Sequence, residues 1–234
     1  MRDQAIARIE LLINENSERL AKGEKLHLVG HSMGGYLQMM AAKKTIEQTF
    51  DFQNALGAIV LIDSPVPLGW RGLLLKTLQA TSLSTKGGPA PIAAKRRYQW
   101  STIEEATRFF AAKPFTQGWH SGVLKDFTSH ALTKINDGSF ELTVPRQVES
   151  DIYAYTTAAE AVQALYYLRE KNISPFFIAG SNSIEVGLAG RQKTYNLFRG
   201  QLEVIEGSHL IPFEEPKRCA NAVLNFLKLK SFKA

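Results

Sequence analysis

Cysteine is nearly absent from the chain, since Cys219 is the only one among 234 residues. No disulfide can therefore form within the chain, which favours a reducing compartment. Cys219 stands in an amphipathic segment near the C-terminus, where a thiol usually serves as a small buried side chain. We expect it to fill space in the core rather than to act as a nucleophile.

Long apolar runs are also missing. Met1-Arg2-Asp3 leads into a charged, amphipathic segment instead of the apolar stretch of a secretory leader. No uninterrupted apolar run is long enough to span a bilayer. We therefore expect a soluble, cytoplasmic protein without a membrane partner.

Ligand-binding signatures are scarce as well. The chain has no Cys-x-x-Cys pair, no glycine-rich dinucleotide fingerprint and no phosphate-binding loop. The glycines from Gly30 to Gly35 enclose a serine where those motifs need a lysine or close backbone approach. We expect neither a metal nor a cofactor.

The excess of positive charge is small. Net charge is +6, from 28 Lys+Arg against 22 Asp+Glu, and the excess is spread along the chain. The densest cluster, Lys95-Arg96-Arg97, is flanked by Tyr98 and Trp100. One short run of this kind is more typical of a solvated helix face than of a nucleic-acid interface. We expect no nucleic-acid partner.

The most informative stretch is Lys25–Leu37, in which an apolar run leads into Gly-x-Ser-x-Gly and then into a helical pattern. The apolar run is typical of a buried parallel strand. A serine between strand and helix lies on a sharp turn, which needs glycine on both sides. The turn would lift the Ser32 hydroxyl above the sheet edge. It would also place the helix N-terminus beneath it, with the Met33 N–H as a donor to an oxyanion.

The full string Gly-His-Ser-Met-Gly-Gly at residues 30–35 resembles the nucleophile elbow of the α/β-hydrolase superfamily, in its lipase- and esterase-like branch. The resemblance implies an α/β fold, with a mostly parallel sheet flanked by helices. It also implies a cofactor-free hydrolase with Ser32 as nucleophile.

Two further apolar runs, Gly57–Ile62 and Ile173–Gly180, predict buried core strands, and the stretch Leu202–Ile205, which alternates apolar and polar residues, predicts an edge strand. In open parallel sheets, functional residues lie beyond the carboxyl ends of the strands. Asp63 directly follows one of these runs, so we expect it at the same sheet edge as Ser32.

A serine nucleophile needs a histidine base within hydrogen-bond reach. His209 lies just after the last predicted strand, and the segment Gly207–Pro212 resembles the Gly-x-His segment of the family, in the chain order Ser, acid, His. We therefore predict His209 as the base. The other histidines receive other roles: His27 structural in its strand, His31 shaping the elbow and bordering the substrate pocket, His120 and His130 in an inserted cap.

Two carboxylates compete for the role of triad acid. The family usually places an Asp three residues past the glycine that ends the penultimate strand, and here that position is Ser183. Glu185, two residues further on, has a longer side chain that could reach back. Asp63 follows the strand after the nucleophile helix, where some family members carry their acid. We favour Asp63 slightly, because a strand end aims a side chain more rigidly than a loop does.

The region between the second and third core strands is mainly helical, and the family commonly carries a helical cap there. The predicted organisation is therefore residues 1–67 as the first part of the core, 68–172 as the cap and 173–234 as the second part of the core. Cap aromatics could line an apolar acyl or aromatic pocket or form the cap's own small core. The candidates are Trp70, Phe109, Phe110 and Trp119.

The N-terminal segment departs from the family. Residues 1–22 predict one helix ended by Gly23, whereas several strands and an oxyanion loop precede this position in full-length relatives. The sequence therefore predicts an N-terminally truncated hydrolase fold without its second oxyanion donor. A second copy of the chain could cover the sheet edge that this leaves open, as a homo-oligomer.

Two functions follow from these patterns. The first is a serine hydrolase that cleaves a small-molecule ester, thioester or amide through an acyl-enzyme on Ser32. The alternative is a hydrolase-fold binding or interaction protein with little or no turnover, favoured by the missing strands and by Ser183 at the usual acid position.

Overall fold

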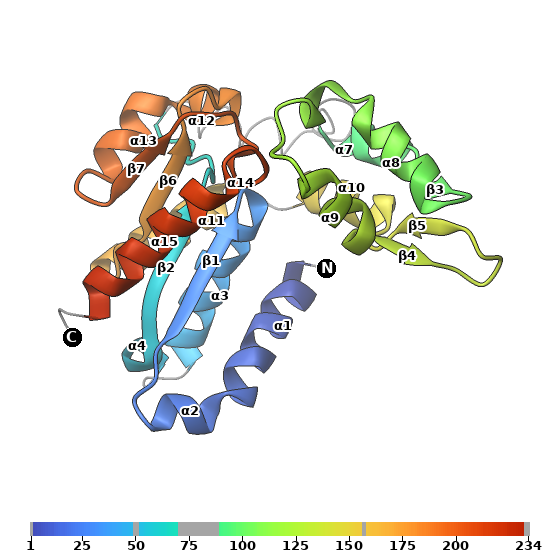
Figure 1. Cartoon of the computed structure of the whole chain (residues 1–234). Helices are drawn as coiled ribbons and strands as arrows, with labels where there is room; N and C mark the ends of the chain where they lie inside the picture. Colours follow the sequence, from blue (N-terminus) through green and yellow to red (C-terminus); the bar gives the residue numbers. More distant parts are fainter. Residues whose placement is uncertain (1, 49–51, 70–88, 156–157, 232–234) are drawn as a thin grey trace. The chain divides into compact units, whose positions relative to one another are not determined.

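The structure is a computed structural model that describes residues 2–48, 52–69, 89–155 and 158–231 (Figure 1). The chain divides into two compact units. The core unit comprises residues 1–77, 157–212 and 216–234, and the insertion unit comprises residues 78–156 and 213–215.

The core unit is built on a four-stranded sheet in which every pair of neighbouring strands is parallel. Its strands, in spatial order, are β1 (Leu26–His31), β2 (Leu56–Ile62), β6 (Phe176–Gly180) and β7 (Leu202–Ile205). The central strands β2 and β6 are apolar throughout, as expected for parallel strands with both faces covered. The predicted parallel α/β sheet is therefore confirmed.

Helices cover both faces of this sheet (Figure 1). The helices of the core unit are α1 (Arg2–Glu15), α2 (Ser17–Ala21), α3 (Met33–Gln48), α4 (Phe52–Ala55), α11 (Ala158–Glu170), α12 (Ile184–Ala189), α13 (Arg191–Leu197) and α15 (Pro216–Ser231). α3 and α11 pack together on one face, in a cluster with Leu165, Leu168 and Phe177 at its centre. α15 covers the other face, where Phe226 stacks on Phe176. The short α14 (Ile211–Glu214) begins in the core unit and ends in the insertion unit.

The N-terminal segment differs from its prediction. It forms two helices rather than one, with a break at Asn16. The Asn16 side chain donates to the Leu12 carbonyl at 2.7 Å, so it competes with the backbone as asparagine commonly does. Gly23, at φ 90°, follows the end of α2 as predicted.

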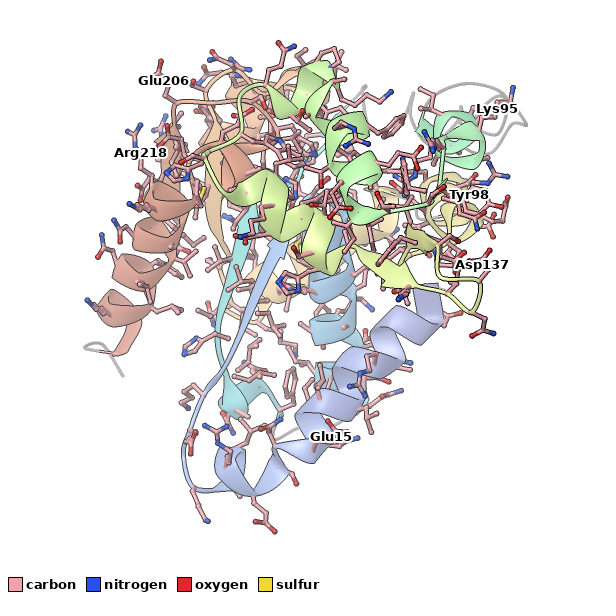
Figure 2. The ribbon with its side chains drawn as sticks, turned by 45° about the vertical axis from the view of Figure 1, so that its right-hand side comes forward. Glu15, Lys95, Tyr98, Asp137, Glu206 and Arg218 are labelled. Carbon is pink, nitrogen blue, oxygen red and sulfur yellow. The ribbon has the colours of Figure 1, made fainter. Side chains whose placement is uncertain are left out.

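The insertion unit combines helices with a small antiparallel sheet. Its elements are α7 (Pro89–Lys95), β3 (Gln99–Trp100), α8 (Ile103–Ala111), the 3₁₀ helix η1 (Pro114–Thr116), α9 (Val123–His130), β4 (Leu132–Lys134), β5 (Phe140–Leu142) and α10 (Arg146–Tyr155). The β4–β5 hairpin is antiparallel, and its turn carries Asp137 (Figure 2). The Asp137 carboxylate accepts from the hydroxyl and the N–H of Ser139, and these bonds lower the pKa of Asp137.

The insertion unit comprises residues 78–156 and 213–215, whereas the predicted cap comprises residues 68–172. Helix α11 belongs to the core unit, because Ala161, Ala164 and Leu165 pack against α3 and the sheet. Residues 213–215, by contrast, belong to the insertion unit, where the Phe213 carbonyl accepts from the His120 N–H at 2.9 Å.

Within the described part of the chain, every helix falls short of the length and apolar character needed to cross a membrane.

Candidate active site

Ser32 lies on a strained turn between β1 and α3. Its φ is 53°, a left-handed conformation that non-glycine residues seldom adopt. A side chain at Gly30 would lie 2.6 Å from the Gly34 backbone, and one at Gly35 would clash with the Ser64 hydroxyl. At Gly34 a side chain would meet nothing within 4 Å. The close approaches therefore lie on both sides of Ser32 as predicted, at Gly30 before it and at Gly35 after it, rather than at the motif glycine Gly34.

Three hydrogen bonds hold this strained turn. The Ser32 N–H donates to the Ile62 carbonyl at 2.9 Å, which extends the β1–β2 ladder through the nucleophile position. The Ser32 carbonyl accepts from the Ser64 hydroxyl at 2.9 Å and from the Gly35 N–H at 3.0 Å. Strain of this kind persists only where the surrounding structure over-determines it, and it is common at functional sites.

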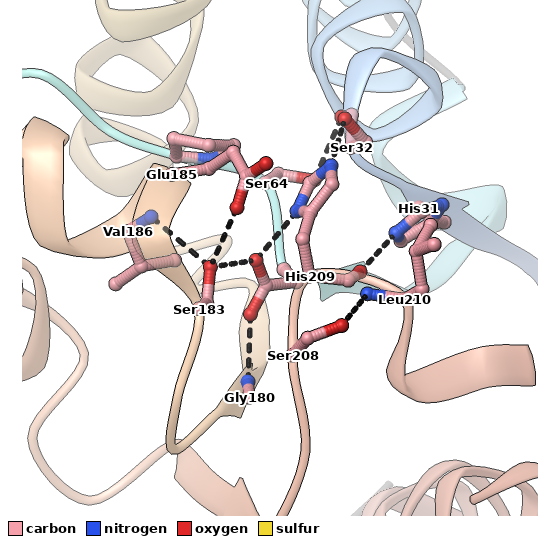
Figure 3. Close-up of polar contacts among 12 residues, drawn as sticks. His31, Ser32, Ser64, Gly180, Ser183, Glu185, Val186, Ser208, His209 and Leu210 are labelled. Carbon is pink, nitrogen blue, oxygen red and sulfur yellow. Dashed lines mark hydrogen bonds and ion pairs between the residues drawn. The ribbon is translucent and has the colours of Figure 1, made fainter. Parts of the chain in front are cut away.

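His209, in the loop after β7, bonds both Ser32 and Asp63, and Figure 3 shows its contact with Ser32. Its Nε2 is 2.9 Å from Ser32 Oγ, and its Nδ1 is 2.7 Å from Asp63 Oδ1. An ionised carboxylate can only accept, so Nδ1 carries the proton and Nε2 accepts from the serine hydroxyl. This is the tautomer that a general base facing Ser32 requires.

Asp63 is fully buried and adopts a left-handed backbone, with φ 44°. Its N–H donates to the Ile178 carbonyl at 2.7 Å, so the residue continues the sheet toward β6. Its Oδ2 accepts from the Gly180 N–H at 2.6 Å, and Oδ1 accepts from the Ser183 hydroxyl at 2.6 Å. A buried carboxylate without such donors would be strongly destabilising, so these bonds compensate its loss of water.

Glu185, the second candidate acid, lies in the first turn of α12 and is exposed. The Glu185 carboxylate lies 3.5 Å from Ser183 Oγ, whereas His209 Nδ1 bonds Asp63. Ser183 itself caps α12, because its Oγ accepts from the Val186 N–H at 3.1 Å. The sequence pattern predicted neither the bond from Ser183 to Asp63 nor its capping of α12. The one sequence signal for both is the position of Ser183, three residues after the glycine that ends β6.

His31 is the remaining residue predicted near the elbow. Its Nε2 is 2.8 Å from the His209 carbonyl oxygen, and the two rings are 4.9 Å apart with planes at 39°. Burial lowers the pKa of His31 below its usual value, although the bond to the His209 carbonyl and the charges of Asp63 and Glu185 favour its charged form.

The remaining histidines are His27, in β1, and His120 and His130, in the insertion unit. His27 is an exposed residue of β1, four residues before His31. A spacing of four residues brings two side chains together on a helix. Here both residues lie in a strand, where the same spacing separates them along the chain. His120 and His130 are exposed residues of the insertion unit, and His120 Nδ1 bonds the Ser121 carbonyl. No group of three potential metal ligands occurs among the described residues.

The predicted oxyanion donor and pocket residues have defined positions. Met33 opens α3, so its N–H has no acceptor within the helix. Phe109 and Phe110 belong to the aromatic cluster of the insertion unit, in contact with Trp100. Trp119 stacks on Phe213 with ring centroids 4.7 Å apart. Trp70 lies outside the described residues. The pocket-lining role of these aromatics stays a prediction.

The parallel sheet, the strained serine at a strand-to-helix turn and the Ser–His–Asp contact define the α/β-hydrolase class. The family model described as "Alpha/beta hydrolase family" matches residues 2–222. The chain therefore belongs to this family. No curated protein sequence matches the chain.

Solved structures with the same fold include hydrolases of several kinds. A peroxisomal alpha-beta-hydrolase from Saccharomyces cerevisiae is similar with a TM-score of 0.66 and 17% identity, over 100% of this chain and 62% of that one. E-2-(acetamidomethylene)succinate hydrolase is similar with a TM-score of 0.63 and 16% identity, over 97% and 74%. An esterase from Mycobacterium tuberculosis is similar with a TM-score of 0.60 and 17% identity, over 96% and 67%. The chain thus spans about two thirds of these relatives, and the likeness at such identity concerns the fold.

Proposed function

We propose that the chain is a serine hydrolase that cleaves carboxylic esters, thioesters or amides through an acyl-enzyme on Ser32. The observation that carries this proposal is the continuous contact from Ser32 Oγ to His209 Nε2, at 2.9 Å, and from His209 Nδ1 to Asp63 Oδ1, at 2.7 Å. Both distances lie within the range that proton transfer and imidazole orientation require.

The first half of the reaction forms the acyl-enzyme. Ser32 Oγ attacks the substrate carbonyl carbon while its proton passes to His209 Nε2. Asp63 stays ionised and stabilises the imidazolium. The negative charge on the carbonyl oxygen lies at the N-terminus of α3, where the Met33 N–H donates to it. When the tetrahedral intermediate collapses, His209 returns the proton to the leaving oxygen, sulfur or nitrogen.

The second half releases the acyl group. A water molecule gives its proton to His209 Nε2 as its oxygen attacks the acyl carbon. The bond from that carbon to Ser32 Oγ then breaks, and His209 returns the proton to Ser32 Oγ. The products are a carboxylic acid and the free enzyme. The similar solved structures include esterases and a thioesterase domain, which supports the range of acyl substrates without choosing among them.

The test is turnover of a short p-nitrophenyl ester by the chain and by its Ser32→Ala variant. We expect kcat/KM to fall about 10⁴-fold or more in Ser32→Ala and in His209→Asn, because removing one triad member disables the whole unit. His130→Ala is the matched control, since His130 is exposed in the insertion unit. A fluorophosphonate reagent should label Ser32 in the unmodified chain.

The binding-protein alternative gives a different result. It predicts no turnover and no fluorophosphonate labelling in the unmodified chain, so that Ser32→Ala changes nothing. That outcome would refute the hydrolase proposal.

A further inference from the structure

His31 makes a contact that none of the catalytic steps above uses. It is the last residue of β1 and precedes Ser32 directly, yet its Nε2 reaches the His209 backbone carbonyl at 2.8 Å. β1 and β7 are the two outer strands of the sheet, and His209 follows β7. The contact therefore joins the strand of the nucleophile to the loop of the base at the carboxyl edge of the sheet (Figure 3).

The His209 loop is also held by backbone contacts at the end of β6. The Asn182 N–H donates to the Gly207 carbonyl at 2.8 Å, and a side chain at Gly180 would clash with the Ser208 carbonyl. These contacts place the loop against β6 but leave the His209 carbonyl to His31. A rotation of that peptide would move the imidazole away from Ser32, because the ring is aimed by its own backbone.

The chemistry of the contact defines the state of His31. A carbonyl oxygen only accepts, so Nε2 of His31 carries the proton. Burial favours the neutral form of this ring and lowers its pKa, although the bond to the His209 carbonyl acts in the opposite direction. A neutral ring suits this position, because the His209 ring centroid is 4.9 Å away and becomes positively charged during the reaction.

We propose that His31 is a positioning residue, whose Nε2–H anchors the main chain of His209 and so holds the imidazole in line with Ser32. The kinetic part of this inference rests on the proposed hydrolase function. The anchoring itself concerns ground-state geometry and can be measured without turnover.

The side chains of glutamine and asparagine provide a matched pair for the test. The amide nitrogen of glutamine lies about where Nε2 of histidine lies, whereas that of asparagine lies about where Nδ1 lies. Both variants carry the same amide group, but only His31→Gln can reach the His209 carbonyl. We expect His31→Gln to keep kcat within about threefold of the unmodified chain. We expect His31→Asn to lose about 10- to 100-fold in kcat with little change in KM.

A residue that only lined the substrate pocket would behave differently. Its replacement would change KM, and His31→Gln would lose as much activity as His31→Asn. Equal kcat values in His31→Gln and His31→Asn would overturn the proposal. If His31→Asn does not fold, as judged by thermal unfolding, His31→Leu replaces it, because leucine fills a similar volume without a donor.

A spectroscopic readout separates this inference from the proposed function. The Nδ1 proton shared by His209 and Asp63 should give a downfield ¹H NMR resonance, assigned by its loss in Asp63→Asn. We expect the resonance to persist in His31→Gln and to shift or broaden in His31→Asn. An unchanged resonance in His31→Asn would overturn the anchoring role, whether or not the protein turns over esters. Absence of turnover in the unmodified chain, with the resonance behaving as expected, would overturn only the hydrolase function.

Discussion

At the scale of single residues, Asp63 combines a left-handed backbone, complete burial and a carboxylate with three hydrogen-bond partners. His209 and Ser183 share Oδ1, and the Gly180 N–H bonds Oδ2. These donors fix the carboxylate in one orientation, so its direction toward His209 does not depend on a flexible side chain. Glu185 has no comparable constraint, since it is exposed at the start of α12.

The two carboxylates can be separated by a pair of amide variants. We expect Asp63→Asn to lower kcat about 10⁴-fold, because the amide favours the wrong imidazole tautomer and cannot stabilise the imidazolium. Glu185→Gln should stay within about threefold, since screening by solvent weakens an exposed charge. Ester kinetics on both variants decides the assignment, and a larger loss in Glu185→Gln than in Asp63→Asn would transfer the acid role to Glu185.

His31 also links the site to stability as a function of pH. Burial lowers the pKa of His31 in the folded state, so the unfolded chain binds its proton more readily. The folded state is therefore favoured above the unfolded pKa of about 6.5, and this contribution is lost as pH falls below that value toward the folded pKa.

The measurement is urea unfolding at pH 7.5 and pH 5.5 for the unmodified chain and for His31→Gln. We expect the drop in free energy of unfolding at low pH to be smaller in the variant. Partial burial also lowers the pKa of His27, and comparison with His31→Gln isolates the His31 share. An equal drop in both proteins would contradict the prediction.

At the scale of elements, the glycine that the strand-to-helix turn needs after Ser32 is Gly35, rather than the motif glycine Gly34. Gly35 lies in the first turn of α3 against β2, where a side chain would clash with Ser64 Oγ and come within 3.1 Å of Leu61. Gly34 faces open space. The close approach of α3 to the β2 end therefore sets the need for glycine, rather than proximity to Ser32 in the sequence.

Two alanine substitutions test this assignment. We expect Gly35→Ala to destabilise the chain by about 1–3 kcal/mol, through overpacking against Ser64 and Leu61. Gly34→Ala should be neutral or stabilising by up to about 1 kcal/mol, because alanine is the better helix former. Urea unfolding of the two variants provides the comparison. Equal destabilisation by the two variants would contradict the assignment of close packing to Gly35 and of an open position to Gly34.

At the scale of the whole molecule, β1 forms one edge of the core sheet, and within the described residues it pairs only with β2. The Ser32 N–H points toward β2, so by alternation the Val29 backbone points outward, where Gln38 Nε2 donates to its carbonyl at 2.5 Å. The Val29 side chain is 40% exposed. An apolar, partly exposed residue on an edge strand is a site for pairing with another strand.

We predict that a second copy of the chain pairs along β1 as a symmetric dimer. Light scattering at several concentrations should show a mass that rises from about one to about two chains. Val29→Lys should return the mass to that of the monomer, because a charge on the edge opposes strand pairing. A strict monomer at all concentrations would remove this prediction.

Local patterns in the sequence were sufficient for much of the architecture. Apolar runs located β1, β2 and β6, since parallel strands covered on both faces need apolar residues, and an alternating pattern located the outer strand β7. The glycine-flanked serine located the turn, and the loop after the last strand placed His209 at the same edge as Ser32. Each of these depends on residues close together in the chain, which is why pattern and spacing were enough.

Contacts between distant segments decided what the sequence left open. Asp63, and not Glu185, bonds His209 because β2 lies beside β6. This pairing brings the Gly180 N–H and the Ser183 hydroxyl to the Asp63 carboxylate. Helix α11 belongs to the core because its apolar face packs on α3, although its residues were expected to lie in the cap. The bond from His31 to the His209 carbonyl depends on both outer strands of the sheet. The sequence by itself determined the parallel sheet, the turn that carries Ser32 and the position of His209 at the same sheet edge. Only the tertiary structure decided which carboxylate bonds His209, because strand order and register, and not distance along the chain, bring these groups together.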